Sequence, residues 1–229
     1  MRLTKVRQVR AVDAVYDVLR ESILDQTFPP GQRLDVRMLA GKLEVSLTPV
    51  KDAITRLAAE GLIELRPRSG TYVTRLSHQD IKDTLGVRRA LECLAAETAM
   101  QNMTEDDLTK FKEFVKILER PVTNERERLQ HERRNNEFHL RLVELSQNRK
   151  LIEIYQLLNA HIKMARVHYR SAAWQQRMSQ ELSEHRSILA ALVKRDPIKL
   201  KRALNDHISR AAEALVRDLK KAESGRDAV

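Results

Sequence analysis

Three histidines of this sequence fall on the apolar faces of three different predicted helices. His139 lies four residues after Asn135, so both side chains point the same way from one helix. His185 and His207 each lie among leucines, isoleucines and alanines at helical spacing. Imidazole nitrogens that converge with one oxygen suit a divalent metal such as Zn²⁺ or Ni²⁺. The alternative is a polar cavity in which water and hydrogen bonds satisfy these groups.

Arg88 and Glu92 form a second group that could do chemistry, four residues apart in a predicted helix. A buried arginine needs an anion beside it. That anion is either an internal glutamate or the carboxylate of a bound small molecule. His161 and Arg166 lie on the inward stripe of a neighbouring helix and are further candidates for the same site.

The remaining histidines and the cysteine indicate no further site. We expect His78, His131 and His168 at the surface and Cys93 as a small buried side chain. A single cysteine excludes an internal disulfide and a CxxC zinc pair. The basic N-terminus lacks the apolar segment of a signal peptide, and no uncharged run approaches about 20 residues. We therefore expect a soluble, cytoplasmic protein.

Long amphipathic helices must position these side chains. After Arg75 the apolar pattern is helical to the end of the chain. The expected helices lie near residues 77–100, 104–119, 124–147, 148–171, 174–194 and 196–222. Thr104 with Asp107, and Asn148, supply N-terminal caps, and Pro197 lies at a helix start. The simplest arrangement is an antiparallel bundle of six or seven helices.

The first seventy-odd residues have a different pattern. An apolar helical stripe precedes a breaker at 28–31, and two shorter helical patterns follow. The stripe consists of Val12, Val15, Tyr16, Leu19 and Ile23. Residues 62–65 and 71–74 then read as two strands joined by a turn at 67–70. This order predicts a winged helix-turn-helix over residues 1–75 and a helical domain over 76–229, so the fold class is mainly α.

Composition supports a helical protein that binds a polyanion. Aromatic residues make up only 4% of the chain, and six glycines and six prolines leave few turns. The net charge is +10, which favours nucleic acid as a partner. The excess positive charge is spread along the chain. Residues 1–75 contain 13 Lys/Arg and 9 Asp/Glu, and the remaining residues contain 29 Lys/Arg and 23 Asp/Glu.

The motifs resemble those of the GntR family of bacterial regulators. The N-terminal segment PPGQRLDVRMLAGKLEVSLTPVKDAITRLAAEGLIELRPRSGTYV follows that family's DNA-binding pattern almost throughout. Downstream, RRALE at 88–92, NNEFH at 135–139, EHRSILAAL at 184–192 and NDHI at 205–208 resemble the FadR-type effector domain, called FCD. The resemblance covers residues 12 to 215 and implies a regulator that binds operator DNA.

The resemblance assigns a recognition helix near residues 46–58 and a wing at 62–74. Ser46, Thr48 and Lys51 can then reach phosphates or base edges. Arg37, in the preceding helix, aligns with a family arginine that faces DNA.

The wing and Leu47 of the recognition helix complete the expected DNA contacts. Arg66 and Arg68 flank the wing hairpin, and Gly70 lets its backbone approach the minor groove. Leu47 and Lys51 stand where the family usually has arginine. Leucine cannot bind guanine bidentately, so we expect a different half-site or weaker base readout. Leu47 could instead contact a thymine methyl group.

In the helical half, the resemblance implies a metal held by His139, His185, His207 and the amide oxygen of Asn135. Amide oxygen is a weaker ligand than carboxylate. Arg88 and Glu92 match the family's R-x-x-L-E, and the implied role of Arg88 is to bind the carboxylate of a small organic acid beside the metal.

The predicted function is a ligand-responsive transcription regulator that binds DNA as a homodimer and is not an enzyme. One alternative is a metal-dependent hydrolase or lyase in the helical half. Against it, no carboxylate stands out near the histidines as a general base, and there is no phosphate loop or GxSxG motif. The other alternative is a DNA-binding protein whose helical half only dimerises.

Overall fold

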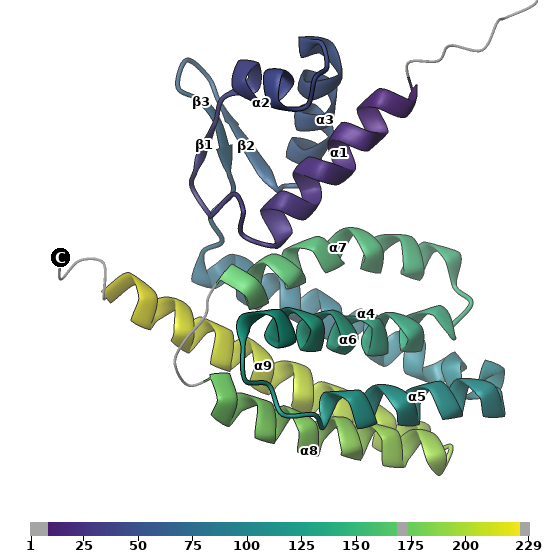
Figure 1. Ribbon diagram of the computed structural model, residues 1–229. Helices are drawn as coiled ribbons and strands as arrows, with labels where there is room; N and C mark the ends of the chain where they lie inside the picture. Colours follow the sequence, from purple (N-terminus) through teal and green to yellow (C-terminus); the bar gives the residue numbers. More distant parts are fainter. Residues whose placement is uncertain (1–8, 169–173, 225–229) are drawn as a thin grey trace, which may run out of the picture. The chain divides into compact units, whose positions relative to one another are not determined.

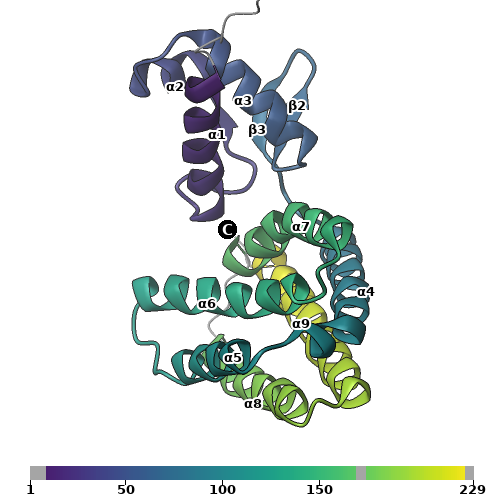
Figure 2. The ribbon, with the colours of Figure 1, turned by 90° about the vertical axis from the view of Figure 1, so that its right-hand side faces the viewer.

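The computed structural model describes residues 9–168 and 174–224 of the chain. The chain divides into two compact units, Met1–Leu76 and Ser77–Val229. The first contains helices and a small sheet, and the second contains helices in its described part (Figures 1 and 2). Among the described residues, no helix has the length and apolar character needed to cross a membrane.

The N-terminal unit is a winged helix-turn-helix, as predicted. Its elements are α1 (Val9–Leu24), β1 (Arg33–Leu34), α2 (Val36–Lys42), α3 (Leu47–Ala59), β2 (Ile63–Arg66) and β3 (Gly70–Val73). The sheet is antiparallel with the order β1-β3-β2. β1 was not predicted, because two residues are too few to show an alternating pattern.

The recognition helix α3 is held by its apolar face and by polar contacts to α1. Val50, Ala53, Ile54 and Leu57 are buried, as predicted. Burying each larger side chain stabilises the fold by about 1.5–3 kcal/mol. At the far end of α3, the Tyr16 hydroxyl of α1 donates to the Glu60 carboxylate at 2.7 Å. These contacts fix the angle at which the opposite face of α3 is presented.

The helical unit contains α4 (His78–Asn102), α5 (Glu105–Leu118), α6 (Glu125–Glu144), α7 (Arg149–His168), α8 (Trp174–Val193) and α9 (Pro197–Ser224). These six helices agree with the prediction to within a few residues. α7 and α8 lie on opposite sides of this unit, with α4, α6 and α9 between them in both views (Figures 1 and 2). α4 packs against α6, α7 and α9, and α8 packs against α9.

Local signals define where these helices begin. Thr104 and Asp107 form a capping box at the start of α5. The Asn148 side chain accepts from the backbone N–H of Leu151 at 3.1 Å, and α9 begins at Pro197. All three starts were predicted.

Candidate functional site

The DNA-facing candidates of the N-terminal unit are exposed on α2 and α3. Ser46, Thr48 and Lys51 lie at the start of α3, opposite its buried face. Ser46 is the N-cap residue, but its side chain makes no capping hydrogen bond. The hydroxyl and the first-turn N–H groups are therefore available to an anion, and the helix dipole favours one there. Arg37 is exposed on α2, in the first turn that Asp35 caps at 2.8 Å.

Leu47 is an exposed apolar side chain in this otherwise polar surface. It is 39% exposed, and Met38 of α2 is 43% exposed. Leu47 is the first residue of α3 and makes no contribution to the buried face. An exposed leucine at this position is available for contact with an apolar base edge.

The wing presents three arginines around the turn between β2 and β3. An open hollow of about 500 Å³ is lined by Arg33, Arg66, Arg68 and Gly70, among others. Arg66 pairs with Glu64 at 2.8 Å, and its guanidinium lies over the Tyr72 ring. Arg33 was not predicted as a contact, since it precedes the helix-turn-helix motif; antiparallel pairing with β3 brings it to the wing.

Gly70 has a conformational reason to be glycine. Its φ is +134°, which is costly for any residue with a side chain, and a Cβ there would lie 3.0 Å from Arg33 Nε. The sequence predicted close approach to DNA; the structure adds backbone strain and the neighbouring Arg33.

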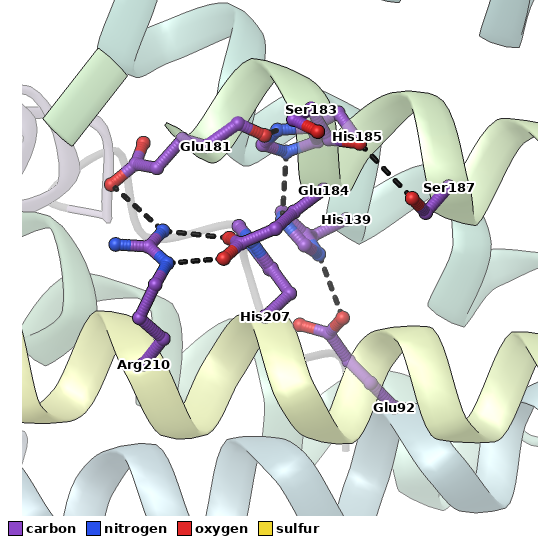
Figure 3. A network of polar contacts seen from close by, with 9 residues as sticks. All are labelled: Glu92, His139, Glu181, Ser183, Glu184, His185, Ser187, His207 and Arg210. Atoms are coloured by element: carbon purple, nitrogen blue, oxygen red, sulfur yellow. Dashed lines mark hydrogen bonds and ion pairs between the residues drawn. The ribbon is translucent and has the colours of Figure 1, made fainter. Parts of the chain in front are cut away.

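In the helical unit, His139, His185 and His207 converge from α6, α8 and α9 (Figure 3). All three are at most 1% exposed. The Nε2 atom of His139 lies 3.3 Å from Nε2 of His185 and 3.2 Å from Nε2 of His207. Phe138 packs edge-on against the rings of His139 and His185, which restricts both. Helical periodicity predicted that each histidine points inward, and the fold brings them together.

The opposite nitrogen of each histidine ring is bound to an oxygen acceptor (Figure 3). His139 Nδ1 lies 2.7 Å from Glu92 Oε2, and His207 Nδ1 lies 2.8 Å from Glu184 Oε2. His185 Nδ1 lies 2.7 Å from the backbone oxygen of Glu181. Ionised carboxylates and carbonyl oxygens only accept hydrogen bonds, so each Nδ1 must donate. The three Nε2 atoms of neutral rings therefore carry lone pairs.

Burial and charge keep His139, His185 and Glu92 in that state. Burial, and then the Arg88 guanidinium, lower the pKa of His139 to about 3. Burial, then His207 and His139, lower the pKa of His185 well below its usual range. Burial alone would raise the pKa of Glu92, but Arg88 and His139 outweigh it and the pKa lies well below its usual value.

This donor set fits a divalent metal. Three lone pairs that face one another cannot satisfy each other by hydrogen bonding, whereas one cation would accept all three. Tetrahedral ligands at about 2.0–2.1 Å from Zn²⁺ lie roughly 3.3–3.4 Å apart, which is close to the spacing of the Nε2 atoms. The buried Asn135 side chain, one helical turn before His139, has no hydrogen-bond partner for Oδ1 or Nδ2 within the described part of the chain.

Arg88 and Glu92 lie beside the triad as a buried ion pair. Arg88 Nε lies 2.6 Å from Glu92 Oε1, and both side chains are at most 1% exposed. The Tyr155 hydroxyl of α7 donates to the same oxygen at 2.8 Å. Glu92 therefore accepts from Arg88, Tyr155 and His139, and its carboxylate orients the His139 ring. The internal salt bridge predicted as one alternative for Arg88 is present.

Comparisons with known proteins match both units. The family model described as "Bacterial regulatory proteins, gntR family" matches residues 11–73, and the FCD domain model matches residues 83–210. The chain belongs to the GntR family. It is a bacterial transcription regulator with an FCD domain, and its family binds DNA.

Relatives of this GntR-family regulator are themselves transcription regulators. The HTH-type transcriptional repressor RspR of Escherichia coli is 28% identical and spans 88% of this chain and 87% of its own. The Nta operon transcriptional regulator of Aminobacter aminovorans is 32% identical over 74% of this chain and 78% of its own. A solved structure described as E. coli McbR/YncC has a TM-score of 0.73 at 21% identity and covers 93% of this chain and 100% of its own, which supports the fold. These relatives do not support the hydrolase or lyase alternative.

The helical unit of the GntR-family chain corrects several expectations. His131 is buried, not at the surface, because it lies one turn before Asn135 on the inward face of α6. His78 and Cys93 are half-buried. The sequence had shown no carboxylate that stands out near the histidines as a general base; Glu92 and Glu184 do lie beside them, and both carboxylates are bound to Nδ1 atoms.

The remaining predicted effector residues lie on α7. His161 is half-buried and lies near Asp80, whose pKa is lowered mainly by hydrogen bonds from Ser77. The side chains of Arg166 and His168 lie outside the described residues. Sequence reasoning missed Glu184 and Tyr155. Glu184 precedes His185 in the EHRSILAAL motif, and Tyr155 is an aromatic hydroxyl on an apolar stripe; those were the available signals.

Proposed function

We propose that this protein is a ligand-responsive regulator that binds operator DNA through residues 1–75, while residues 76–229 bind a small organic acid at a divalent metal and form a homodimer. It would act in the cytoplasm, where operator DNA is found. The observation that carries the ligand-binding part is the convergence of three Nε2 lone pairs whose rings are each fixed at Nδ1.

The proposed DNA contacts come from α2, α3 and the wing. Ser46, Thr48 and Lys51 would bind phosphates or base edges from the exposed start of α3, assisted by Arg37. Arg66, Arg68 and Gly70 would place the wing in the minor groove, with Arg33 beside them. Leu47 would contact a thymine methyl, so the half-site should prefer thymine where an arginine-bearing relative prefers guanine.

The proposed metal ligands are His139, His185, His207 and Asn135 Oδ1. Nitrogen donors with one neutral oxygen suit Zn²⁺ or Ni²⁺. When bound, the metal would supply a Lewis acid that holds a carboxylate oxygen. Glu92 and Glu184 keep His139 and His207 in the tautomer that presents Nε2.

Arg88 would bind the acid's carboxylate beside the metal. Its guanidinium is buried next to the triad and is held in place by Glu92. Glu92 itself, with three donors, acts as a positioning residue. His161 and Arg166 remain proposed contacts on α7.

A homodimer would form through α4 and α7. These helices pack against each other, and each exposes two large apolar side chains at about half of their surface: Val87 and Leu94 on α4, and Ile154 and Leu157 on α7. We propose that a second copy of the chain buries these four apolar side chains. Leu94→Glu and Leu157→Glu should sediment as monomers, whereas Ile198→Glu, at an 80% exposed position on α9, should not change the assembly. A dimer that survives both α4 and α7 substitutions would place the interface elsewhere.

Metal analysis and a screen of acids test the proposed function. Dialysed full-length protein should retain one divalent ion per chain, and His207→Ala should retain none. Carboxylic acids should raise the melting temperature, and Arg88→Met should abolish that rise. If the wild-type protein retains no metal and no acid raises its melting temperature, the result would support the alternative in which the helical unit only dimerises.

A further inference from the structure

In the part of the helical unit that the structure describes, two buried asparagines have side-chain amide atoms without a hydrogen-bond partner. Asn135 is 1% exposed, and neither Oδ1 nor Nδ2 has a partner among the residues that the structure describes. Asn159 is 8% exposed, and its Oδ1 has no partner in the same set. Buried polar groups are almost always satisfied, because desolvation without a hydrogen bond is costly. The two amides therefore indicate a place where another molecule supplies the missing partners.

The two asparagines lie on the same side of Glu92. His139 of α6 and Tyr155 of α7 both donate to the Glu92 carboxylate, so these residues are level with each other. α6 and α7 are consecutive antiparallel helices (Figure 1). One turn back along α6 leads from His139 to Asn135, and one turn forward along α7 leads from Tyr155 to Asn159. Because the helices are antiparallel, both four-residue steps lead in the same direction by about 6 Å.

Arg88 belongs to this layer as well. Near its C-terminal end, α4 contacts the α6–α7 connection, where Asn102 Nδ2 donates to the Leu145 backbone oxygen at 2.8 Å. α4 therefore runs parallel to α6. One turn back along α4, from Glu92 to Arg88, leads in the same direction as the step from His139 to Asn135 along α6. Arg88 Nε and the Tyr155 hydroxyl both donate to Glu92 Oε1, at 2.6 Å and 2.8 Å. The layer beside the histidine triad thus holds Arg88, Asn135 and Asn159.

We propose that the effector is a hydroxy acid, and that Asn159 is the residue that selects its hydroxyl group. This rests on the proposed function, in which Arg88 and the metal bind the carboxylate. A hydroxyl group both donates and accepts, so it can donate to Asn159 Oδ1 and accept from Asn135 Nδ2. Asn135 Oδ1 then stays directed to the metal, and every orphaned amide atom has a partner.

Other acids fit this layer less well. An acid without a hydroxyl leaves Asn159 Oδ1 buried and unpaired, and a second carboxylate would place oxygen against oxygen. Sites built to hydrogen-bond a hydroxyl discriminate strongly against the analogue that lacks it, because their own polar groups lose their partners.

Matched pairs of acids test the proposal on the full-length, metal-loaded chain. Calorimetric titration should show that lactate binds about 10- to 100-fold more tightly than propanoate, and malate more tightly than succinate, by the loss of one or two buried hydrogen bonds. Asn159→Leu should remove this preference by weakening lactate and malate binding, and it should not weaken the binding of propanoate and succinate, because no amide oxygen is then left unpaired. Gln156→Leu, at an exposed position of the same helix, is the control and should keep the preference.

The outcomes separate the two levels of the proposal. Wild-type protein that binds each pair equally well would overturn the assignment of Asn159 while the acid-sensor function stands. Binding of no acid would remove both. If Asn159→Leu does not fold, Asn159→Asp is the substitute, because it keeps an acceptor oxygen. This variant should bind all acids more weakly while it preserves the preference for those with a hydroxyl group. Loss of that preference in Asn159→Asp would also overturn the assignment.

Discussion

The buried carboxylate of Glu92 provides a sharp test of how the helical unit is held together. Glu92→Gln keeps the size of the side chain but removes its charge and one of its acceptor oxygens. The Arg88 guanidinium, 1% exposed and 2.6 Å from Glu92, would become an uncompensated buried charge. Breaking such a pair from one side costs about 3–5 kcal/mol. With 2–4 °C per kcal/mol for a chain of this size, the melting temperature should fall by roughly 6–20 °C.

Thermal and urea unfolding in chelating buffer measure this effect without a contribution from bound metal. The matched control is Glu97→Gln on the same helix, whose ion pair with Lys201 at 2.5 Å is 51% and 40% exposed. An exposed pair of that kind contributes about 0–1 kcal/mol.

The double variant Arg88→Met with Glu92→Gln removes both charges and should recover most of the lost stability, because no buried charge is left alone. Equal stability of Glu92→Gln and Glu97→Gln, or a double variant as unstable as Glu92→Gln alone, would contradict this prediction.

Three further outcomes follow from the structure. Leu47→Arg should shift the selected half-site toward guanine by about 1–3 kcal/mol of discrimination; sequence selection from random DNA that returns the same site for both proteins would contradict this. Gly70→Val should weaken operator binding while leaving metal retention unchanged, because the strain at φ +134° and the contact with Arg33 are confined to the wing. A gel-shift assay that gives the same operator affinity for the variant and the wild type would contradict this. Asp107 has its pKa lowered to about 2, where hydrogen bonds from Arg141 and Thr104 outweigh burial. Its contribution to stability is present above its ordinary value of 3.8 and is lost as pH falls through about 2, so Asp107→Asn should flatten the acid limb of the unfolding curve; an unchanged limb would show that other groups control it.

Periodicity predicted much of the fold and part of the site. His139, His185 and His207 could be assigned to inward faces because each lies on an apolar stripe of a long helix. Which helices meet is a tertiary property, so the partners of Nδ1 could not be assigned: Glu184 reaches His207 from the preceding helix.

Residues missed by the sequence argument share a physical reason. His131 lies in a strongly charged stretch, which favours a solvated face, although it is spaced by four residues from Asn135. Asn159 interrupts the buried stripe of α7, four residues after Tyr155, and a polar residue there has no visible role until its missing partner is found. Arg33 reaches the wing only through a two-residue strand.

The most direct test of the central claim is equilibrium binding of the full-length, metal-loaded protein to its selected operator, with and without the acid that stabilises it most. Binding of the acid should change the operator affinity by about 5- to 150-fold, the usual range for coupled sites. His207→Ala should bind the same operator without responding to the acid. An operator affinity that no stabilising acid changes would contradict the account.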